Sequence, residues 1–337
     1  MRSIYSITRK KLEDYFILNN DKKFRATQIF EWVYRKNIKS FDEITNVNKE
    51  SINKLKEDFE FNSLKILKKQ EDVDVKKYLF ELNDGNKIES VVMYHDYGVS
   101  ICVSSQIGCN MGCVFCESGR LKKVRNLTVD EMLLQVIQVQ NDINERISHI
   151  VIMGIGEPFD NYDNVIDFIN IANDDYALAI GARHITVSTS GIVPKIYEFA
   201  KEYSQVNLAI SLHAPNNEIR NKIMKINKAY DINQLMNAVK DYIKLTNRRV
   251  TFEYIMLKAI NDTDECAYEL SKLLKGINCY VNLIPYNETN NIGFKRSDTS
   301  QISRFCDILN KENINVRIRR EFGSKVSAAC GQLRSEN

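Results

Sequence analysis

The feature that most restricts the fold of this chain is an alternation of apolar and amphipathic segments that begins near residue 98. Short apolar runs such as SICVSS, HIVIMG and HITVSTS are each followed by a stretch with apolar residues at helical spacing. Six such strand–helix units follow one another up to about residue 312. Strands separated by helices pair in parallel through right-handed crossovers. The sequence therefore predicts an α/β fold, a β/α barrel that is either complete or partial.

The remaining segments have other patterns. Residues 1–60 carry apolar residues at helical spacing, and residues 64–94 alternate around an Asn-Asp-Gly turn, which predicts a small antiparallel sheet. A chain of 337 residues is long enough for about two domains. We expect four parts: an N-terminal helical accessory domain (1–60), a β-rich connecting segment (61–97), the partial barrel (98–312), and a C-terminal strand and loop (313–337).

Composition excludes several classes of protein. The 47 Lys and Arg against 44 Asp and Glu leave a net charge of +3, so no global field indicates a nucleic-acid partner. The apolar runs are too short to span a membrane, and the N-terminus, MRSIYSITRKKLEDYF, has no apolar core of a secretion signal. We expect a cytoplasmic protein. Basic residues surround Phe30, Trp32 and Tyr34, and we interpret them as a solvated helix face over an aromatic core rather than an RNA-binding surface.

Polar clusters follow four of the predicted strands. They are Gly154–Pro158, Ser188–Gly191, Ser211–His213 and Pro285–Asn287. Any one of them could merely turn the chain. In a β/α barrel, however, the carboxyl ends of the strands form one mouth, where active sites lie. The four clusters together predict a shared site.

The cysteines are the other unusual feature, because four of the eight fall between residues 102 and 116. A disulfide framework is not expected in a large cytosolic chain. Cys109, Cys113 and Cys116 have the spacing C-x3-C-x2-C on the loop after the first barrel strand. Structural zinc sites use four ligands, and no second pair of cysteines is present. Three thiolates suit a 4Fe-4S cluster in which one iron has no protein ligand.

These motifs resemble a known family. C-x3-C-x2-C with an aromatic residue before the last cysteine, on the first loop of a β/α barrel, looks like the radical S-adenosylmethionine superfamily. VSSQIGCNMGCVFC, MGIGEP, VSTSGIVP, LAISLHAPNNEIR, FEYIML, VNLIPYN and AACGQL follow one another as in the RlmN/Cfr family of ribosomal RNA adenine methyltransferases. FRATQIFEWVY resembles that family's accessory segment, so the resemblance covers about residues 22–334.

The resemblance implies methylation of an adenine ring carbon through a methylated cysteine. One S-adenosylmethionine methylates the cysteine, and a second is cleaved at the cluster to a radical that activates this methyl group. The methylene adds to the adenine, and a base and a second thiol resolve the crosslink by forming a disulfide. Cys330 in AACGQL matches the methyl-carrying cysteine, Cys102 the resolving thiol, and Glu89 the proton acceptor. Without the resemblance, Cys102 would be a core residue and Glu89 an ordinary strand glutamate.

The resemblance also implies the ligands of two cofactors, a 4Fe-4S cluster and S-adenosylmethionine. Cys109, Cys113 and Cys116 match the cluster ligands. The residues that match cofactor contacts are Gly156, Glu157, Ser188, Ser211, Leu212, His213 and Asn287. A carboxylate such as Glu157 is the natural partner for the ammonium group of S-adenosylmethionine. Cys266, Cys279 and Cys306 have no motif context, and we interpret them as structural.

Two segments depart from the family pattern. Glu117-Ser118-Gly119 stands where the family commonly has Ala-Thr-Gly, and Gly323-Ser324-Lys325-Val326-Ser327 replaces Gly-Asp-Asp-Ile-Asp before Cys330. An acidic residue beside the cluster would disfavour its reduced state. The second segment presents the methyl-cysteine, so it bears on which carbon is methylated and on which RNA.

The implied partners are 23S rRNA, with tRNA as a second candidate, and a reductant such as flavodoxin or ferredoxin; we expect a monomer. Basic residues at 120–125 and 317–320 would border the mouth and could contact phosphates. MGIGEP and STSG look more like RlmN, which methylates C2, than like Cfr, which methylates C8 and confers antibiotic resistance. The alternative of another class is a non-catalytic iron–sulfur RNA-binding protein, which would need none of Cys102, Cys330 and Glu89.

Overall fold

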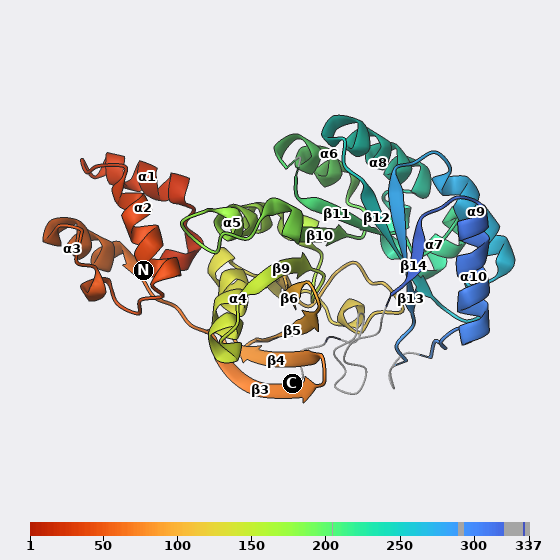
Figure 1. The fold of residues 1–337 in the computed structure, drawn as a ribbon, viewed down its shortest axis with the longest axis horizontal. Helices are drawn as coiled ribbons and strands as arrows, with labels where there is room; N and C mark the ends of the chain where they lie inside the picture. Colours follow the sequence, from red (N-terminus) through yellow and green to blue (C-terminus); the bar gives the residue numbers. More distant parts are fainter. Residues whose placement is uncertain (204, 289–292, 320–332, 334–337) are drawn as a thin grey trace.

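A single ten-stranded sheet organises the protein, whose computed structural model describes residues 1–203, 205–288, 293–319 and 333. The strand order is β14-β13-β12-β11-β10-β9-β6-β5-β4-β3, and Figure 1 shows helices packed along the outside of the curved parallel part. Strands β14 and β3 lie at opposite ends of this order, so the described strands do not close into a barrel. The partial α/β barrel predicted from the alternation is confirmed.

Seven neighbouring strands of the sheet are parallel. They are β6 (Gly98–Cys102), β9 (Ile147–Ile152), β10 (Ile185–Thr189), β11 (Asn207–Ser211), β12 (Val250–Met256), β13 (Cys279–Pro285) and β14 (Val316–Ile318). Their apolar runs are buried because helices cover the sheet on its convex side. Parallel pairing places the carboxyl ends of all these strands on the same side of the sheet.

The crossover helices are amphipathic, and several begin at defined caps. They are α4 (Val129–Ile143), α5 (Tyr162–Asn173), α6 (Val193–Glu202), α7 (Asn217–Ile223), α8 (Ile232–Thr246), α9 (Asp264–Leu274) and α10 (Thr299–Lys311). Thr128 with Glu131 caps α4, and Asp231 with Gln234 caps α8, each as a reciprocal capping box. Short 3-10 turns η5 (Pro158–Asn161), η6 (Ala182–His184) and η7 (Lys225–Lys228) complete the connections.

The segment 61–97 forms an antiparallel meander, as its alternation predicts. Its strands are β3 (Lys65–Asp72), β4 (Val75–Glu81) and β5 (Lys87–His95). They do not form a separate sheet, because β5 pairs antiparallel with β6 and so extends the main sheet. The physical reason is that the middle of β5 is buried on both faces and needs hydrogen-bonded strands on both edges.

The N-terminal helices pack as a small layer beside the sheet (Figure 1). They are η1 (Ile4–Ser6), α1 (Arg9–Leu18), α2 (Arg25–Phe30), a π-helical turn η2 (Glu31–Arg35), η3 (Phe41–Glu43) and α3 (Lys49–Asp58). Strand β1 (Arg2–Ser3) pairs in parallel with β2 (Phe59–Glu60) and joins the two ends of this layer. The Phe30 and Tyr34 rings lie 5.1 Å apart, with Phe30 buried, so these aromatic residues pack inside the layer.

Hydrogen bonds attach the layer to the barrel. The buried Asp130 at the start of α4 accepts hydrogen bonds from Ser6 Oγ (2.8 Å) and Asn62 Nδ2 (2.8 Å). Burial alone would raise the pKa of Asp130, but hydrogen bonds from Thr128, Asn62 and Ser6 outweigh it and leave the pKa below its ordinary value. Among the described residues, no helix has the length and apolar character needed to cross a bilayer.

Candidate active site

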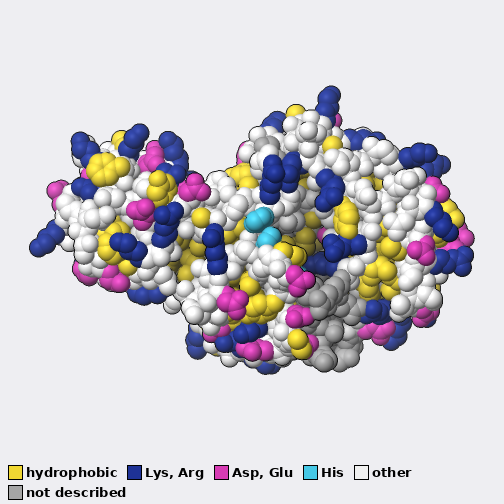
Figure 2. Space-filling view, viewed as in Figure 1, with side chains coloured by type: hydrophobic (Ala, Val, Ile, Leu, Met, Phe, Trp, Pro, Cys, Tyr) yellow, Lys and Arg dark blue, Asp and Glu magenta, His cyan; other side chains and the backbone are white. Residues whose placement is uncertain are grey.

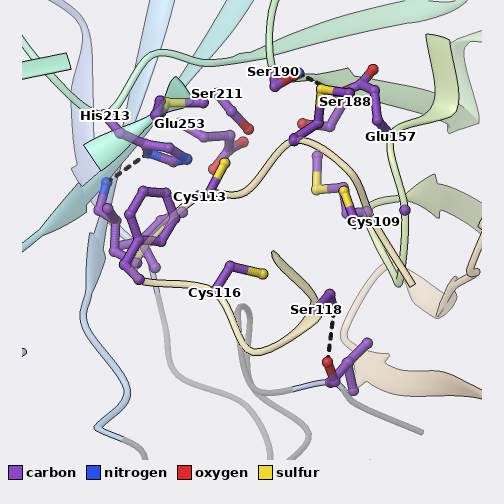
Figure 3. Close-up of a pocket in the computed structure, with 18 of the residues that line it drawn as sticks. Cys109, Cys113, Cys116, Ser118, Glu157, Ser188, Ser190, Ser211, His213 and Glu253 are labelled. Carbon is purple, nitrogen blue, oxygen red and sulfur yellow. Dashed lines mark hydrogen bonds between the residues drawn. The ribbon is translucent and has the colours of Figure 1, made fainter. Parts of the chain in front are cut away.

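A cavity that is partly open to solvent lies at the carboxyl ends of the parallel strands. Residues predicted from the sequence supply much of its wall (Figure 3): Cys109, Cys113, Cys116, Gly156, Glu157, Ser188, Ser211 and His213. The three cysteines come from the loop after β6, and the other five from the ends of β9, β10 and β11. The fold therefore brings the cysteine loop and three of the four predicted polar clusters together.

The cysteine loop is held at its base by a two-stranded ribbon. Strand β7 (Gln106–Ile107) pairs antiparallel with β8 (Arg125–Asn126). Gly108 has a φ of +72°, and a Cβ at this position would lie 2.2 Å from the carbonyl oxygen of Lys122. Only glycine fits this close approach without a shift of the backbone. The loop then turns through Cys113 and Cys116, where the Cys116 N–H donates to the Cys113 carbonyl at 3.2 Å.

Burial raises the pKa of the Cys109 thiol to about 12 and also raises the pKa values of Cys113 and Cys116 above their ordinary value. Without a metal, the three thiols would therefore remain protonated at neutral pH. Metal ligation requires the thiolate, and a bound metal removes the proton. The three thiols have the chemistry of a site that is completed by its metal.

The arrangement fits a cluster better than a single ion. In the described part of the chain, no three His, Cys, Asp or Glu side chains converge closely enough to hold one metal ion. The three thiols instead border a common cavity. In a 4Fe-4S cluster each thiolate binds a different iron, so the ligands must surround a space rather than meet at a point. Three cysteines would leave the fourth iron of such a cluster without a protein ligand.

Glycines allow the loop after β9 to pass close to the end of β6. Gly156 has a φ of +112°, and a Cβ there would lie 2.6 Å from the Cβ of Gln106. A Cβ on Gly154 would lie 2.7 Å from the carbonyl oxygen of Val103. The two loops can therefore contact each other only because neither glycine has a side chain. This contact places Glu157 beside the cysteine loop.

Glu157 joins the ends of two strands through its carboxylate. Its Oε1 accepts from the Phe159 N–H at 3.0 Å, and its Oε2 accepts from the Ser190 N–H at 2.7 Å. The residue is 3% exposed, and burial raises the pKa of its carboxyl although these hydrogen bonds act in the opposite direction. A cationic group bound in the cavity would favour the ionised carboxylate. Glu157 is therefore a suitable partner for a ligand ammonium group.

His213 is held in one tautomer by the neighbouring strand. Its Nδ1 accepts a 3.0 Å hydrogen bond from the Ile255 N–H, so a neutral ring carries its proton on Nε2. Burial and the nearby charge of Arg220 lower the pKa of His213 to about 3. The edge of the ring packs against Phe115 of the cysteine loop, with centroids 5.0 Å apart. His213 is thus a neutral donor at physiological pH.

Arg220 was not predicted as a site residue. Its fully buried guanidinium donates to the carbonyls of Ser190 (2.6 Å), Leu212 (3.1 Å) and Ser211 (3.2 Å) and to Asn227 Oδ1 (3.0 Å). It connects the ends of β10 and β11 beneath the cavity. The only sequence signal was its position in LAISLHAPNNEIR, since three of its four hydrogen-bond partners are backbone carbonyls.

Glu253 is a second site residue that the sequence analysis missed. It lines the cavity from β12, and its Oε1 accepts from Asn282 Nδ2 at 2.9 Å. Its Oε2 is buried 3.7 Å from Arg319 Nη1 and has no hydrogen-bond partner among the described residues. Its position inside FEYIML could have identified it. Alternate residues of a strand point to opposite faces of the sheet, and Glu253 lies on the face toward the barrel interior.

Two predicted contacts do not line this cavity. The Leu212 side chain packs in the hydrophobic core, and the backbone of Leu212 hydrogen-bonds to Glu253 and Arg220. Asn287 follows β13 and is buried outside the cavity wall. Because its side chain lies in the core, Leu212 could contact a ligand only through its backbone.

Of the three residues predicted for the chemistry, Glu89 and Cys102 are described, and neither lines this cavity. Glu89 on β5 is buried and forms an ion pair with Lys77 on β4, with 2.9 Å between Nζ and Oε1. Cys102 pairs with Val91 of β5 in the sheet and lies beside a cluster that contains Val91 and Leu333. Cys330 lies outside the described residues, as do the changed residues 323–327. The described cysteines form no disulfide with one another.

Leu333, three residues after Cys330, is described and lines the cavity. Its carbonyl accepts a 2.7 Å hydrogen bond from Ser118 Oγ of the cysteine loop (Figure 3). Ser118 belongs to η4 (Ser118–Arg120), in the segment that departs from the family pattern. The Ser118–Leu333 hydrogen bond thus joins the C-terminal motif to the cysteine loop.

The basic residues after the cysteine loop are largely ion-paired. Lys123 pairs with Asp160 (2.8 Å), and Arg125 pairs with both Asp84 (2.6 Å) and Glu131 (2.7 Å). Figure 2 shows Lys and Arg side chains distributed over the visible face together with acidic ones. Arg319, in the second basic segment, lines the cavity and lies 3.7 Å from Glu253 Oε2.

Comparison with known proteins agrees with the site. Residues 103–270 match the Radical SAM superfamily, and residues 3–61 match the ribosomal RNA large subunit methyltransferase N-terminal domain. The chain is 54% identical to a protein of Spiroplasma citri over 100% of this chain and 98% of that protein. It is also 54% identical to one of Enterococcus faecalis over 99% and 96%. Both relatives are named probable dual-specificity RNA methyltransferase RlmN.

Solved structures show the same fold. A radical SAM methyltransferase from Sphaerobacter thermophilus superposes with a TM-score of 0.92 at 39% identity, over 100% of both chains. Streptococcus suis SuiB bound to S-adenosylmethionine superposes with a TM-score of 0.52 at 15% identity, over 67% of this chain and 51% of that one. The second likeness concerns the fold alone.

Proposed function

This chain belongs to the RlmN family of radical S-adenosylmethionine enzymes, and on that premise we propose that it methylates C2 of an adenosine in the peptidyl-transferase centre of 23S rRNA. A tRNA adenosine is the second proposed substrate, since the named relatives are dual-specificity RNA methyltransferases. One observation carries the proposal: the cysteine loop, the polar strand ends and Leu333 of the C-terminal motif line a single cavity.

Cys109, Cys113 and Cys116 are the proposed ligands of a 4Fe-4S cluster. When bound, the cluster supplies the electron that cleaves S-adenosylmethionine and so provides the radical chemistry. Cys113 and Cys116 are surrounded by apolar residues, with Phe115 and Met224 in the same small core. This packing limits the access of water to these two thiols.

Glu157 is the proposed partner of the ammonium group of S-adenosylmethionine. Its carboxylate is already oriented by the Phe159 and Ser190 amides, so binding requires little rearrangement. Gly156 lines the cavity beside it, and the hydroxyls of Ser188 and Ser211 and the Nε2–H of His213 can hydrogen-bond to the rest of the cofactor. Leu212 and Asn287 complete the proposed set. Two cofactor molecules are proposed per turnover, one as methyl donor and one cleaved.

Cys330 is proposed to carry the methyl group as a thioether, and its activated methylene adds to the adenine. Glu89 then accepts the proton that leaves C2 as the adduct radical gives up one electron, for which the bound cluster, oxidised when S-adenosylmethionine was cleaved, would be the acceptor. The thiolate of Cys102 then attacks the sulfur of Cys330. The attack forms a Cys102–Cys330 disulfide and breaks the bond between sulfur and the new methyl carbon, which takes up a proton. The Ser118–Leu333 hydrogen bond and the shared cluster of Cys102 with Leu333 support this arrangement.

The second candidate is methylation at C8 of the same adenosine. It is favoured only by the changed segment 323–327, whose residues differ from the family's usual acidic ones. The segments MGIGEP and STSG favour C2. A monomeric cytoplasmic enzyme that receives electrons from flavodoxin or ferredoxin is part of the same proposal.

The test is mass spectrometry of nucleosides from 23S rRNA and tRNA of cells with and without the gene. We expect 2-methyladenosine to depend on the gene. 8-Methyladenosine instead would establish the second candidate. Unchanged nucleosides, together with RNA binding by the purified protein, would establish a non-catalytic binding protein and contradict the proposal.

A further inference from the structure

A buried ion pair lies behind the cavity, between neighbouring strands of the meander. Lys77 Nζ of β4 and Glu89 Oε1 of β5 are 2.9 Å apart, and their side chains are 6% and 2% exposed. In the antiparallel register, Lys77 lies opposite Val91 and Glu89 opposite Leu79, so the two form a diagonal pair on one sheet face. By contrast, the Lys65–Glu81 pair of the same meander has side chains 72% and 31% exposed.

The face that carries this pair points toward the site. Val91, opposite Lys77, is also opposite Cys102 of β6. Val91 packs in a cluster with Ile155 of the loop after β9 and with Leu333. The backbone of Glu89 is also anchored, because its carbonyl accepts from Ser104 Oγ at 2.6 Å, and Ser104 Oγ in turn accepts from the Ile155 N–H at 3.0 Å. Glu89 is therefore fixed relative to both the loop after β9 and the strand of Cys102.

The cost of burying a charged carboxylate indicates a role for Lys77 beyond packing. Burial disfavours a charged carboxylate and promotes its protonation. A protonated carboxyl group has no capacity to accept a proton from a substrate. A buried ammonium within hydrogen-bonding distance stabilises the ionised form and also fixes the orientation of the carboxylate. An apolar residue would satisfy the packing of this buried strand equally well.

We propose that Lys77 is a positioning residue of the methylation reaction, which keeps Glu89 ionised and oriented to accept the proton from C2 of the adenine. This inference rests on the proposed function, in which Glu89 is the proton acceptor. In the step concerned, the RNA–protein adduct radical gives up one electron, for which the bound oxidised cluster would be the acceptor. The C2–H bond breaks with its electron pair staying in the ring, and the proton moves to a Glu89 carboxylate oxygen. In this proposal Lys77 acts through Glu89 and does not contact the substrate.

The test compares Lys77→Met, Lys77→Arg and Glu89→Gln in the cluster-loaded protein with an rRNA fragment as substrate. Lys76→Met is the matched control, because Lys76 is the next residue on β4, on the opposite face, with an ion pair to the exposed Glu71. Four quantities are measured: methylated Cys330 by mass spectrometry, 5′-deoxyadenosine formed, covalent protein–RNA adduct on denaturing gels, and kcat and KM for the RNA.

We expect Lys77→Met to form methylated Cys330 and 5′-deoxyadenosine as the wild type does. Its kcat should fall at least tenfold, with KM changed less than about twofold, and the covalent adduct should accumulate as in Glu89→Gln. Lys77→Arg should restore turnover to within about threefold of the wild type, and Lys76→Met should match it. If Lys77→Met does not fold, Lys77→Gln takes its place in the same comparison.

Normal turnover by Lys77→Met or Lys77→Gln, with Glu89→Gln stalled, would overturn the role of Lys77 and leave the proposed function intact. Normal turnover by Glu89→Gln would remove Glu89 as the acceptor, and the inference with it. A Lys77→Arg variant that folds, loads its cluster and still stalls would also contradict the inference, because the charge is then retained.

Discussion

Ser118 Oγ donates a 2.7 Å hydrogen bond to the carbonyl oxygen of Leu333 and so links the cysteine loop to the C-terminal motif. Both residues are buried, at about 5% exposure each. A buried hydrogen bond between two segments so distant in sequence stabilises their contact by about 1 kcal/mol. The Glu-Ser-Gly sequence, which departs from the family's usual Ala-Thr-Gly, thus retains a hydroxyl where this contact needs one.

Removing that hydroxyl should weaken the approach of the C-terminal motif to the cluster. We expect Ser118→Ala to lower the methylation rate by about fivefold, which corresponds to the loss of about 1 kcal/mol. Iron content and S-adenosylmethionine binding should stay unchanged, and Ser118→Thr should restore the rate. Rates measured at saturating RNA, with iron determined on the same samples, check this. Equal rates for Ser118→Ala and wild type would show that the contact has no part in turnover.

The sequence was sufficient for the parallel strands and for the cysteine loop, because periodicity and spacing are local properties. It was not sufficient for the pairing of β5 with β6, because alternation identifies a strand but not its neighbours. The diagonal contact of Lys77 with Glu89 depends on the register of β4 and β5, which the residues alone do not specify. Arg220 was missed for another reason, since three of its four hydrogen bonds go to backbone carbonyls.

Loss of the resolving thiol should stop the proposed reaction after the RNA has become attached. We expect Cys102→Ala to accumulate a covalent protein–RNA species, because no thiolate then attacks the sulfur of Cys330. Cys279→Ala is the control, since Cys279 is a buried cysteine of β13 outside the cavity wall. Denaturing gels followed by nuclease treatment and mass spectrometry identify the species. Free methylated RNA at the wild-type rate from Cys102→Ala would exclude Cys102 from the reaction.

Glu157 should determine the affinity for S-adenosylmethionine. Glu157→Gln removes the charge and places an NH2 group opposite either the Ser190 or the Phe159 amide, both of which now donate to the carboxylate. We expect affinity to fall by roughly 10- to 100-fold, since hydrogen bonds between charged groups contribute about 1.5–3 kcal/mol. Isothermal titration of the cluster-loaded protein checks this, with the exposed Glu198→Gln as control. An unchanged affinity would show that the ammonium group binds elsewhere.

The buried His213 should make the fold sensitive to acid. Its pKa is about 3 in the folded chain and 6.5 for an ordinary histidine, so between these pH values the unfolded chain binds a proton that the folded chain does not. The free energy of unfolding therefore falls as the pH decreases below 6.5, by about 2 kcal/mol at pH 5. His213→Asn should lack this component, because asparagine tolerates the left-handed backbone at this position (φ +57°) and does not titrate. Urea unfolding at pH 7.5 and pH 5 checks this; an equal loss in both proteins would contradict it.

Arg220 should be the residue on which the shape of the cofactor site depends most. Its guanidinium donates to carbonyls at the ends of β10 and β11, and Arg220→Met would leave the Ser190 and Leu212 carbonyls buried without these donors. Each buried group left without a partner costs about 1–3 kcal/mol, so we expect a loss of roughly 2–5 kcal/mol in the free energy of unfolding.

Arg220→Lys should recover only part of this stability, because one ammonium cannot reach carbonyls on both strands and Asn227 together. Arg183→Met, which removes an exposed arginine beside the start of β10, should stay within about 0.5 kcal/mol of wild type. Urea unfolding of the four proteins, prepared identically, measures the differences. If Arg220→Met were as stable as Arg183→Met, the two strand ends would be held by their own backbone pairing. Weaker S-adenosylmethionine binding in Arg220→Met would then have to arise from the lost charge rather than from a displaced Ser190 or Ser211.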